Sequence, residues 1–489
     1  MLGWVSFIII LGLSTYWIYV LSKNTSLSSK LYIAGFYVKL CFAISYVLLF
    51  TYYFSDGKLY GDSYRFIYDS YAINQLAYSD FSAYLNLLFG NIDITNAQVI
   101  KALSQTHIWD YGENGDWIND NRLILKINSL IHFVSFKNIY VHALIFSLIS
   151  FLGIHLIYRT FENFIGNKKA FWIMIIAFPN FAFWSSAILK ESIFIFGIGL
   201  FVFYVFKWIN KQKSIIYIVF SIVGCLLLLF NKPYAGLFII LFSLTYILGA
   251  YLNWKIKGLI ISTILIGFLA IIVIFIPSRL NITSKISTKQ TDLNNLGKGG
   301  IAFINDTAFC VFDYQLLNSF EIVEESKIKV KDTIVGECKL FGQSKYNSII
   351  IHPSSQVYDV YLIYPPSTSY SSPVLINHSP VQLLLNIPQA LVNTVIRPFP
   401  WDNGDPLKII NFISNLFFLV FIIYIVRNKR KLTNQEKYIL YFLIGSALFI
   451  LLIVGLTVPI FGAIVRYKIP AELLIIISGF IILKPKHET

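Results

Sequence analysis

The sequence predicts an all-α polytopic membrane protein, and two observations carry that prediction. Hydrophobic residues make up 56% of the 489 residues and charged residues only 13%, which is more apolar surface than a soluble fold can cover. The apolar residues also gather into about eleven runs long enough to cross a bilayer as helices. The predicted transmembrane helices are 3–21, 31–53, 139–158, 171–187, 190–206, 215–230, 234–252, 258–277, 408–426, 438–458 and 469–483. A polar kink separates the helices predicted over 171–187 and 190–206.

The loops between these runs predict the orientation of the chain. Met1 to Leu21 lacks a basic leading region, so it is interpreted as a first spanning helix rather than a cleaved signal. Lys and Arg concentrate in alternate short loops, for example at 168–169 and 427–431, which marks that side as cytoplasmic. The N-terminus is then outside and the C-terminus inside. Because the net charge of +14 is spread over loops rather than one basic face, no nucleic-acid partner is expected.

This orientation places two long segments on the extracytoplasmic side. The first loop, 55–137, is rich in Asp, Tyr and Asn and belongs to an N-terminal transmembrane module, 1–276. The second segment is an extracytoplasmic insertion, 277–406, before the C-terminal transmembrane helices, 407–489. Its middle is β-branched and bounded by Gly, Pro and Ser, so a small β-rich insertion is predicted around 328–334, 346–351 and 357–364.

Cysteine and acidic residues in these segments leave two questions open. Cys310 and Cys338 share the insertion, and they form a disulfide only if it faces an oxidising compartment. The acidic turn 110–117 lacks the ligand spacing of an EF-hand, and the seven histidines show no metal-ligand spacing. No metal site or certain cofactor is therefore predicted, although a divalent cation stays an open alternative.

Asp62 is the leading catalytic candidate. It follows Gly61 where a helix is expected to begin, so nearby N–H groups and the helix dipole would hold its carboxylate ionised. Asp69 lies seven residues further, on the same helical face. Two interpretations of Asp62 stay open: an N-cap, and a general base at the membrane surface. Arg122, which begins an amphipathic helix predicted over 122–136, joins Asp69 as a substrate-binding candidate.

Charged residues at the outer ends of the predicted spans supply the other candidates, because idle charge beside a membrane is costly. Lys190 and Glu191 follow Trp184-Ser185-Ser186, where the alternative is an interfacial anchor. Lys232 lies in a tight turn. It is a substrate-binding candidate, and the alternative is that it only contributes to the orientation of the chain in the membrane. The remaining substrate-binding candidates are Arg397, Arg466 and Tyr467. Arg466 runs against the positive-inside bias, and its guanidinium matches phosphate geometry.

These cations, together with an acidic first loop, suit a lipid-anchored phosphate and a hydroxyl that must lose a proton. The pattern resembles the GT-C superfamily of integral membrane glycosyltransferases, which take sugars from polyprenyl-phosphate carriers. The resemblance rests on the overall topology and on short motifs: Gly61-Asp62-Ser63 with Tyr68, the segment from Pro179 to Glu191, Arg397-Pro398-Phe399, and Arg466-Tyr467-Lys468 with Pro470. Two spans precede the acidic loop here rather than one, and Ser63 stands where several members carry a second acid.

The resemblance implies a GT-C-like transferase of the bacterial inner (cytoplasmic) membrane that builds cell-envelope polysaccharide or a related glycan. Asp62 would deprotonate an extracytoplasmic acceptor (glycan, lipid or protein), and the lipid phosphate of the sugar donor would leave toward Arg466. One alternative is an O-antigen polymerase-like or ligase-like enzyme that depends on the arginines of the outer loops, such as Arg397, rather than on Asp62. Two others are a non-enzymatic lipid-oligosaccharide flippase and a structural membrane subunit.

Overall fold

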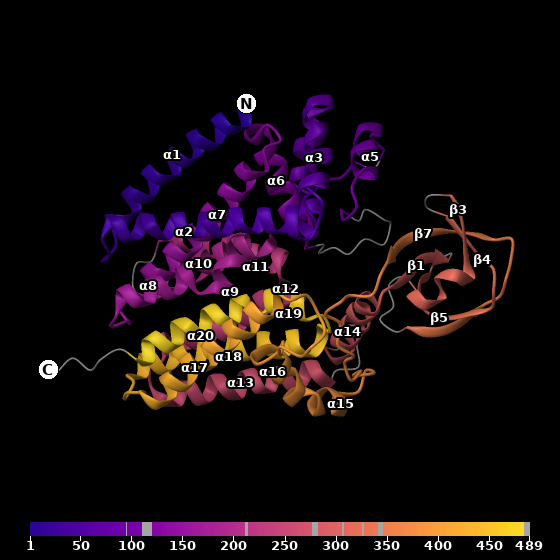
Figure 1. Cartoon of the computed structure of the whole chain (residues 1–489). Helices are drawn as coiled ribbons and strands as arrows, with labels where there is room; N and C mark the ends of the chain where they lie inside the picture. The colour runs from indigo at the N-terminus through magenta and orange to yellow at the C-terminus, as the bar shows by residue number, and fades with distance from the viewer. Residues whose placement is uncertain are drawn as a thin grey trace. The chain divides into compact units, whose positions relative to one another are not determined.

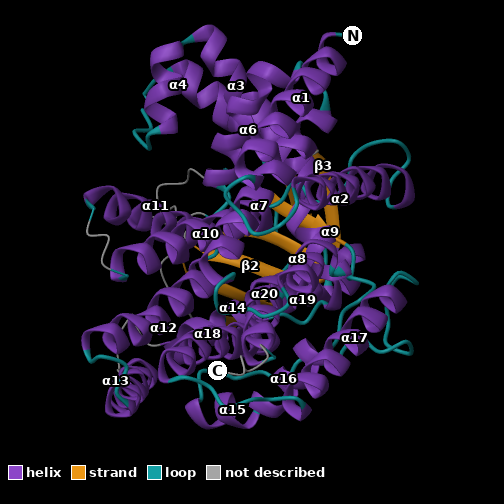
Figure 2. Cartoon of the chain, turned by 90° about the vertical axis from the view of Figure 1, so that its left-hand side faces the viewer, coloured by secondary structure: helices purple, strands orange, loops and turns teal. Residues whose placement is uncertain are grey.

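The computed structural model of the chain describes residues 1–93, 95–109, 120–210, 214–275, 282–305, 308–324, 327–340 and 346–483. The chain divides into two compact units. Unit 1 comprises Met1–Leu259, Tyr424–Ala447 and Ile469–Thr489, and unit 2 comprises Ile260–Ile423 and Leu448–Lys468. Figure 1 labels most of their elements, and Figure 2 shows many helices, joined by loops, and one group of strands. The predicted acidic turn 110–117 lies outside the described residues.

The residues of unit 1 that the structure describes form helices joined by turns and loops. Its long apolar helices hold a mainly aliphatic and aromatic core, and shorter helices form the segment between α2 and α7. Its helices are α1 (Leu2–Ser22), α2 (Ser29–Leu48, extended by a π-helical turn Leu49–Tyr53), α3 (Asp62–Ser79), α4 (Phe81–Leu88), α5 (Ala97–Ser104), α6 (Arg122–Ser135), α7 (Ile139–Phe161), α8 (Lys168–Ala177), α9 (Pro179–Ser186), α10 (Lys190–Ile209), α11 (Ile215–Asn231) and α12 (Pro233–Tyr251). The last helix of the chain, α20 (Ile469–Ile482), also belongs to unit 1.

Three helices cross the boundary by which the two units are divided: α13 (Ile256–Phe275), α17 (Lys408–Arg427) and α18 (Asn434–Thr457). Unit 2 adds α14 (Ile282–Lys298), α15 (Pro380–Leu385), α16 (Ile387–Val395), α19 (Phe461–Tyr467), a 3₁₀ turn (Tyr314–Ser319) and strands β1 (Gly300–Asn305), β2 (Ala308–Asp313), β3 (Phe320–Glu324), β4 (Lys327–Val330), β5 (Ile334–Leu340), β6 (Asn347–Ile351) and β7 (Val357–Tyr364). The strands form one antiparallel sheet in the order β3-β4-β7-β1-β2-β5-β6.

The prediction of a helical membrane protein with a small sheet is confirmed. Among the described residues, seven helices are long and apolar enough to cross a membrane: α1, α2, α7, α10, α12, α17 and α18. Three more predicted spans are shorter apolar helices, over 215–231, 256–268 and 469–482. The predicted span 171–187 is instead two short helices, α8 and α9, because Pro179 cannot continue the hydrogen-bond ladder of α8. A count of eleven stays a prediction.

The disulfide between Cys310 and Cys338, which the sequence leaves open, is present. Cys310 on β2 faces Cys338 on β5, and the two sulfur atoms are bonded. The bond joins neighbouring strands on the buried side of the sheet, among apolar residues such as Phe303 and Phe312. The sheet core thus contains both a covalent link and stacked aromatic rings.

Helices α7 and α10 approach closely because glycines line their contact. A Cβ added at Gly153 of α7 would lie 2.6 Å from the carbonyl oxygen of Ile195, and Gly199 of α10 faces Gly153 in turn. Small residues allow helix backbones to pack this tightly inside a membrane, where no hydrophobic effect drives helices together.

We expect Gly153→Ala to destabilise the protein by about 1–3 kcal/mol, because the added methyl group forces two backbones apart. Thermal unfolding in detergent, followed with a thiol-reactive dye, measures the loss. Gly12→Ala on α1 is the matched control, since nothing lies within 4 Å of its added Cβ. Equal melting temperatures for the two variants would contradict the tight α7–α10 crossing.

Candidate functional site

Asp62 is the first residue of α3, as the sequence predicts. The chain turns into the helix at Gly61, whose φ of 76° favours glycine, and Asp62 then lies in the first turn with its side chain half-buried. A carboxylate here lies near the unpaired N–H groups and the positive end of the helix dipole. The start of α3 therefore stabilises an ionised carboxylate.

The next residue, Ser63, ties this helix start to the beginning of α10. Its buried hydroxyl donates to the carbonyl oxygen of Ile188 at 2.9 Å, and it also lies 2.9 Å from the hydroxyl of Tyr46 on α2. Ile188 precedes Lys190 by two residues. The backbone of the Asp62–Ser63 pair is thereby held beside the segment that leads into Lys190.

Lys190, Glu191 and Lys232 gather in the same part of unit 1. The ammonium of Lys190 lies 2.8 Å from a carboxylate oxygen of Asp120, and the side chain of Asn231 donates to the Lys190 carbonyl oxygen at 2.6 Å. Lys232 and Glu191 form a buried ion pair at 2.6 Å, with side-chain exposures of 3% and 0%. The starts of α10 and α12 are thus joined by one ion pair, and a second ion pair joins the start of α10 to Asp120.

Asp69 holds a loop in place. Its carboxylate is fully buried and accepts three hydrogen bonds at 2.9 Å: from the backbone N–H groups of His107 and Ile108 and from the His107 ring. These contacts fasten the segment after α5 to the middle of α3. Contact between Asp69 and a substrate stays a prediction.

Arg122 begins α6 and lies against Trp109. Its Nε donates to the carbonyl oxygen of Trp109 at 3.3 Å, and its guanidinium carbon lies 5.6 Å from the centre of the indole ring. The ammonium of Lys126, one turn later, lies 6.0 Å from the same ring. This face of α6 therefore carries two cations above one buried indole.

Arg397, in unit 2, is held by a carboxylate. Its Nη2 and Nε donate to the two oxygens of Asp402 at 2.6 and 3.0 Å, and its guanidinium lies 4.4 Å from the centre of the Phe461 ring. Burial alone would raise the pKa of Asp402, but the bonds from Arg397 and from the Phe399 N–H outweigh burial and lower the pKa. The pair closes the turn that follows α16.

Arg466 and Tyr467 end α19, also in unit 2. The Arg466 guanidinium lies 5.2 Å from the centre of the Tyr467 ring, and both side chains are half-buried. The neighbouring Lys468 is buried, and its ammonium donates to the Thr394 carbonyl oxygen and to the Asn415 side chain. Asp62, Asp69, Arg122, Lys190, Glu191 and Lys232 thus belong to unit 1, whereas Arg397, Arg466 and Tyr467 belong to unit 2.

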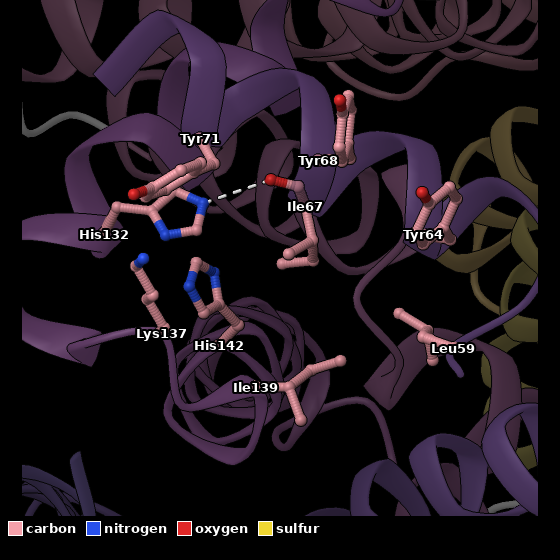
Figure 3. Close-up of a pocket in the computed structure, with 9 residues that line it drawn as sticks. All are labelled: Leu59, Tyr64, Ile67, Tyr68, Tyr71, His132, Lys137, Ile139 and His142. Atoms are coloured by element: carbon pink, nitrogen blue, oxygen red, sulfur yellow. Dashed lines mark hydrogen bonds between the residues drawn. The ribbon is translucent and has the colours of Figure 1, made fainter. Parts of the chain in front are cut away.

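One cavity in unit 1 was absent from the sequence-based expectations. It lies between α3 and the beginning of α7, has a volume of about 220 Å³, and is lined by three tyrosines of α3 with His132, Lys137 and aliphatic side chains (Figure 3). Tyr64, Tyr68 and Tyr71 repeat at helical spacing, which is the sequence signal that could have marked this face. We call it the tyrosine pocket.

The residues that the structure describes contain no group of three or more His, Cys, Asp or Glu side chains suited to hold a metal ion. Neither a protein-family model, nor a curated protein, nor a solved structure matches the chain. The proposals below therefore rest on residues and geometry.

Proposed function

We propose that the protein is a membrane glycosyltransferase that moves a sugar from a polyprenyl-phosphate-linked donor to an extracytoplasmic acceptor. The observation that carries the proposal is the position of Asp62: a carboxylate at a helix start, tied through Ser63 to the segment that leads into Lys190. A base and a cation joined in this way suit a reaction in which a hydroxyl loses a proton and a phosphate departs.

The proposed reaction inverts the configuration at the anomeric carbon. Asp62 takes the proton of the acceptor hydroxyl, and the oxygen attacks the anomeric carbon. The bond between that carbon and the phosphate oxygen breaks, and its electron pair leaves on the lipid phosphate. Lys190, which belongs to unit 1 with Asp62 and follows the Ile188 carbonyl bound by Ser63 by two residues, is the proposed cation beside the departing phosphate.

We further propose that the chain crosses the membrane about eleven times, in the GT-C manner, with the reacting groups on the extracytoplasmic side. The 17 residues of α11 extend about 26 Å, which is close to the thickness of the hydrocarbon core. The disulfide between Cys310 and Cys338 supports an oxidising environment for the sheet. Localisation in the bacterial inner membrane belongs to the same proposal.

The polymerase-like or ligase-like alternative is less well supported, because it needs Arg397 to bind a diphosphate. Nε and Nη2 of that guanidinium already donate to Asp402, and separating the two residues would leave a buried carboxylate without its partner.

Purified protein in liposomes tests the proposal. With a polyprenyl-phosphate donor that carries a labelled sugar, together with an envelope extract as acceptor, we expect the label to leave the lipid and free polyprenyl phosphate to accumulate. Movement of intact donor across the bilayer without release of polyprenyl phosphate would contradict transfer and indicate a flippase. Empty liposomes provide the background rate.

A further inference from the structure

The tyrosine pocket offers ring faces along its walls and polar atoms at one end. Tyr64 and Tyr68 stack with ring centres 5.8 Å apart and are 41% and 44% exposed. Figure 3 shows the side chains of Leu59 and Ile139 on the same side of the pocket as Tyr64, with His132 and Lys137 at the opposite end. The volume of about 220 Å³ is below that of typical sites for drug-sized ligands, so the pocket has room for about one ring.

The imidazole of His132 presents an unused acceptor at the polar end. Its Nε2 lies 3.2 Å from the carbonyl oxygen of Ile67 and 3.1 Å from the Ser70 hydroxyl, which donates its own hydrogen to the same carbonyl at 2.9 Å. Both neighbours of Nε2 therefore accept, so the ring hydrogen is on Nε2. Its Nδ1 is buried and has no hydrogen-bond partner among the described residues. Burial is the main cause that lowers the pKa of His132 to about 4, so the ring is neutral near pH 7 and Nδ1 carries a lone pair.

Lys137 supplies a donor beside that acceptor. Its ammonium lies 4.8 Å from the centre of the Tyr71 ring, and its charge is a further cause of the low His132 pKa. The other imidazole of the pocket is already occupied, because both His142 nitrogens lie within hydrogen-bond distance of Asn128 and Ser135. A ligand at this end therefore meets one cationic donor and one neutral acceptor.

We propose that the tyrosine pocket binds a single sugar ring. A sugar hydroxyl can accept from the Lys137 ammonium and donate to His132 Nδ1, whereas an ionised phosphate or carboxylate has no hydrogen to give to Nδ1. The C–H faces of a sugar ring pack against the exposed faces of Tyr64 and Tyr68. A hydroxyl-rich ring of this size satisfies the polar end and the aromatic walls together.

This site is distinct from the proposed catalytic group. On a helix, residues two apart face nearly opposite directions, so Tyr64 and Asp62 lie on different faces of α3. Asp69 shares the face of Asp62 and is buried, whereas Tyr68 is largely exposed. Sugar binding here requires no transfer chemistry and stands whether or not the chain is a transferase.

Saturation-transfer NMR on the full chain in lipid nanodiscs tests the proposal, with the methyl glycosides of glucose, galactose and N-acetylglucosamine as probes. We expect at least one glycoside to receive saturation on its ring protons. We expect about tenfold weaker binding in Tyr68→Ala, through the lost ring face, and in Lys137→Met, through the lost donor. Melting temperatures equal to that of the parent show that each variant is folded.

Two controls of the same residue types lie outside the pocket: Tyr78→Ala, also on α3, and Lys101→Met on α5, both of them exposed. Parental binding in these controls supports the assignment. Failure of every glycoside to bind overturns it, as does binding that is insensitive to both pocket substitutions. Farnesyl phosphate, added as a competing probe, overturns it if it binds the pocket when no glycoside does, since the site would then be one for a lipid phosphate.

Discussion

Asp62→Asn is expected to lower sugar transfer by about 10²–10⁴-fold, because a neutral amide cannot take the proton of the attacking hydroxyl. Asparagine has nearly the same shape and still caps a helix start, so membrane insertion and melting temperature should match those of the parent. Initial rates with a labelled lipid-linked donor in liposomes measure the effect. The loss should lie in the rate of the chemical step, with little change in the donor concentration that half-saturates the enzyme.

Asp56→Asn is the matched control, since Asp56 is an exposed carboxylate in the turn before α3 and should be replaceable at no cost to activity. Arg397→Gln, measured in parallel, separates the two enzymatic hypotheses. Two results together would contradict the assignment of Asp62 as the base and favour the ligase-like mechanism. They are near-parental sugar transfer by Asp62→Asn and complete loss of transfer in a folded Arg397→Gln protein.

Glu191→Ala is expected to destabilise the protein by about 3–5 kcal/mol, because it removes the counter-charge of the Lys232 ammonium at a site shielded from water. Both side chains lie at helix starts, so the loss should loosen the entrances to α10 and α12. Thermal unfolding in detergent measures the change.

The double variant Glu191→Ala with Lys232→Met should recover much of that loss, since it removes both buried charges instead of one. Glu324→Ala supplies a surface comparison: its partner Lys327 and Glu324 itself are 41% and 61% exposed, so its effect should stay below about 1 kcal/mol. A double variant less stable than Glu191→Ala would argue against the lost counter-charge as the source of the effect.

The sequence was informative where local chemistry decides structure. Apolar runs mark spanning helices because backbone groups in lipid must bond within their own helix. The sequence predicts the start of α3 at Asp62 and the start of α10 at Lys190, since Gly61 precedes the first and the pair Ser185-Ser186 interrupts the apolar run before the second. The strands over 347–351 and 357–364 likewise follow from β-branched runs between turn residues. The predicted run 328–334 is instead divided, because β4 ends at Val330 and β5 begins at Ile334 and continues to Leu340.

Long-range partners could not be predicted in the same way. The spacing of seven residues predicts that Asp69 and Asp62 share a helical face. The sequence gives no sign that the backbone N–H groups of residues 107–108 donate to the Asp69 carboxylate. The pairing of Lys190 with Asp120 joins residues 70 positions apart, and the tyrosine pocket joins α3 to the start of α7. Such contacts depend on how amphipathic helices pack, which side-chain periodicity alone leaves undetermined.

The first and last strands of the sheet in the sequence, β1 and β7, pair with each other. Gly300, where β1 begins, is the register partner of Tyr364, where β7 ends. The polypeptide therefore enters and leaves the sheet at two Cα positions that lie about 5 Å apart, as paired residues of antiparallel strands do. Strands attached in this way can be lengthened, shortened or replaced without a change in the position of α14.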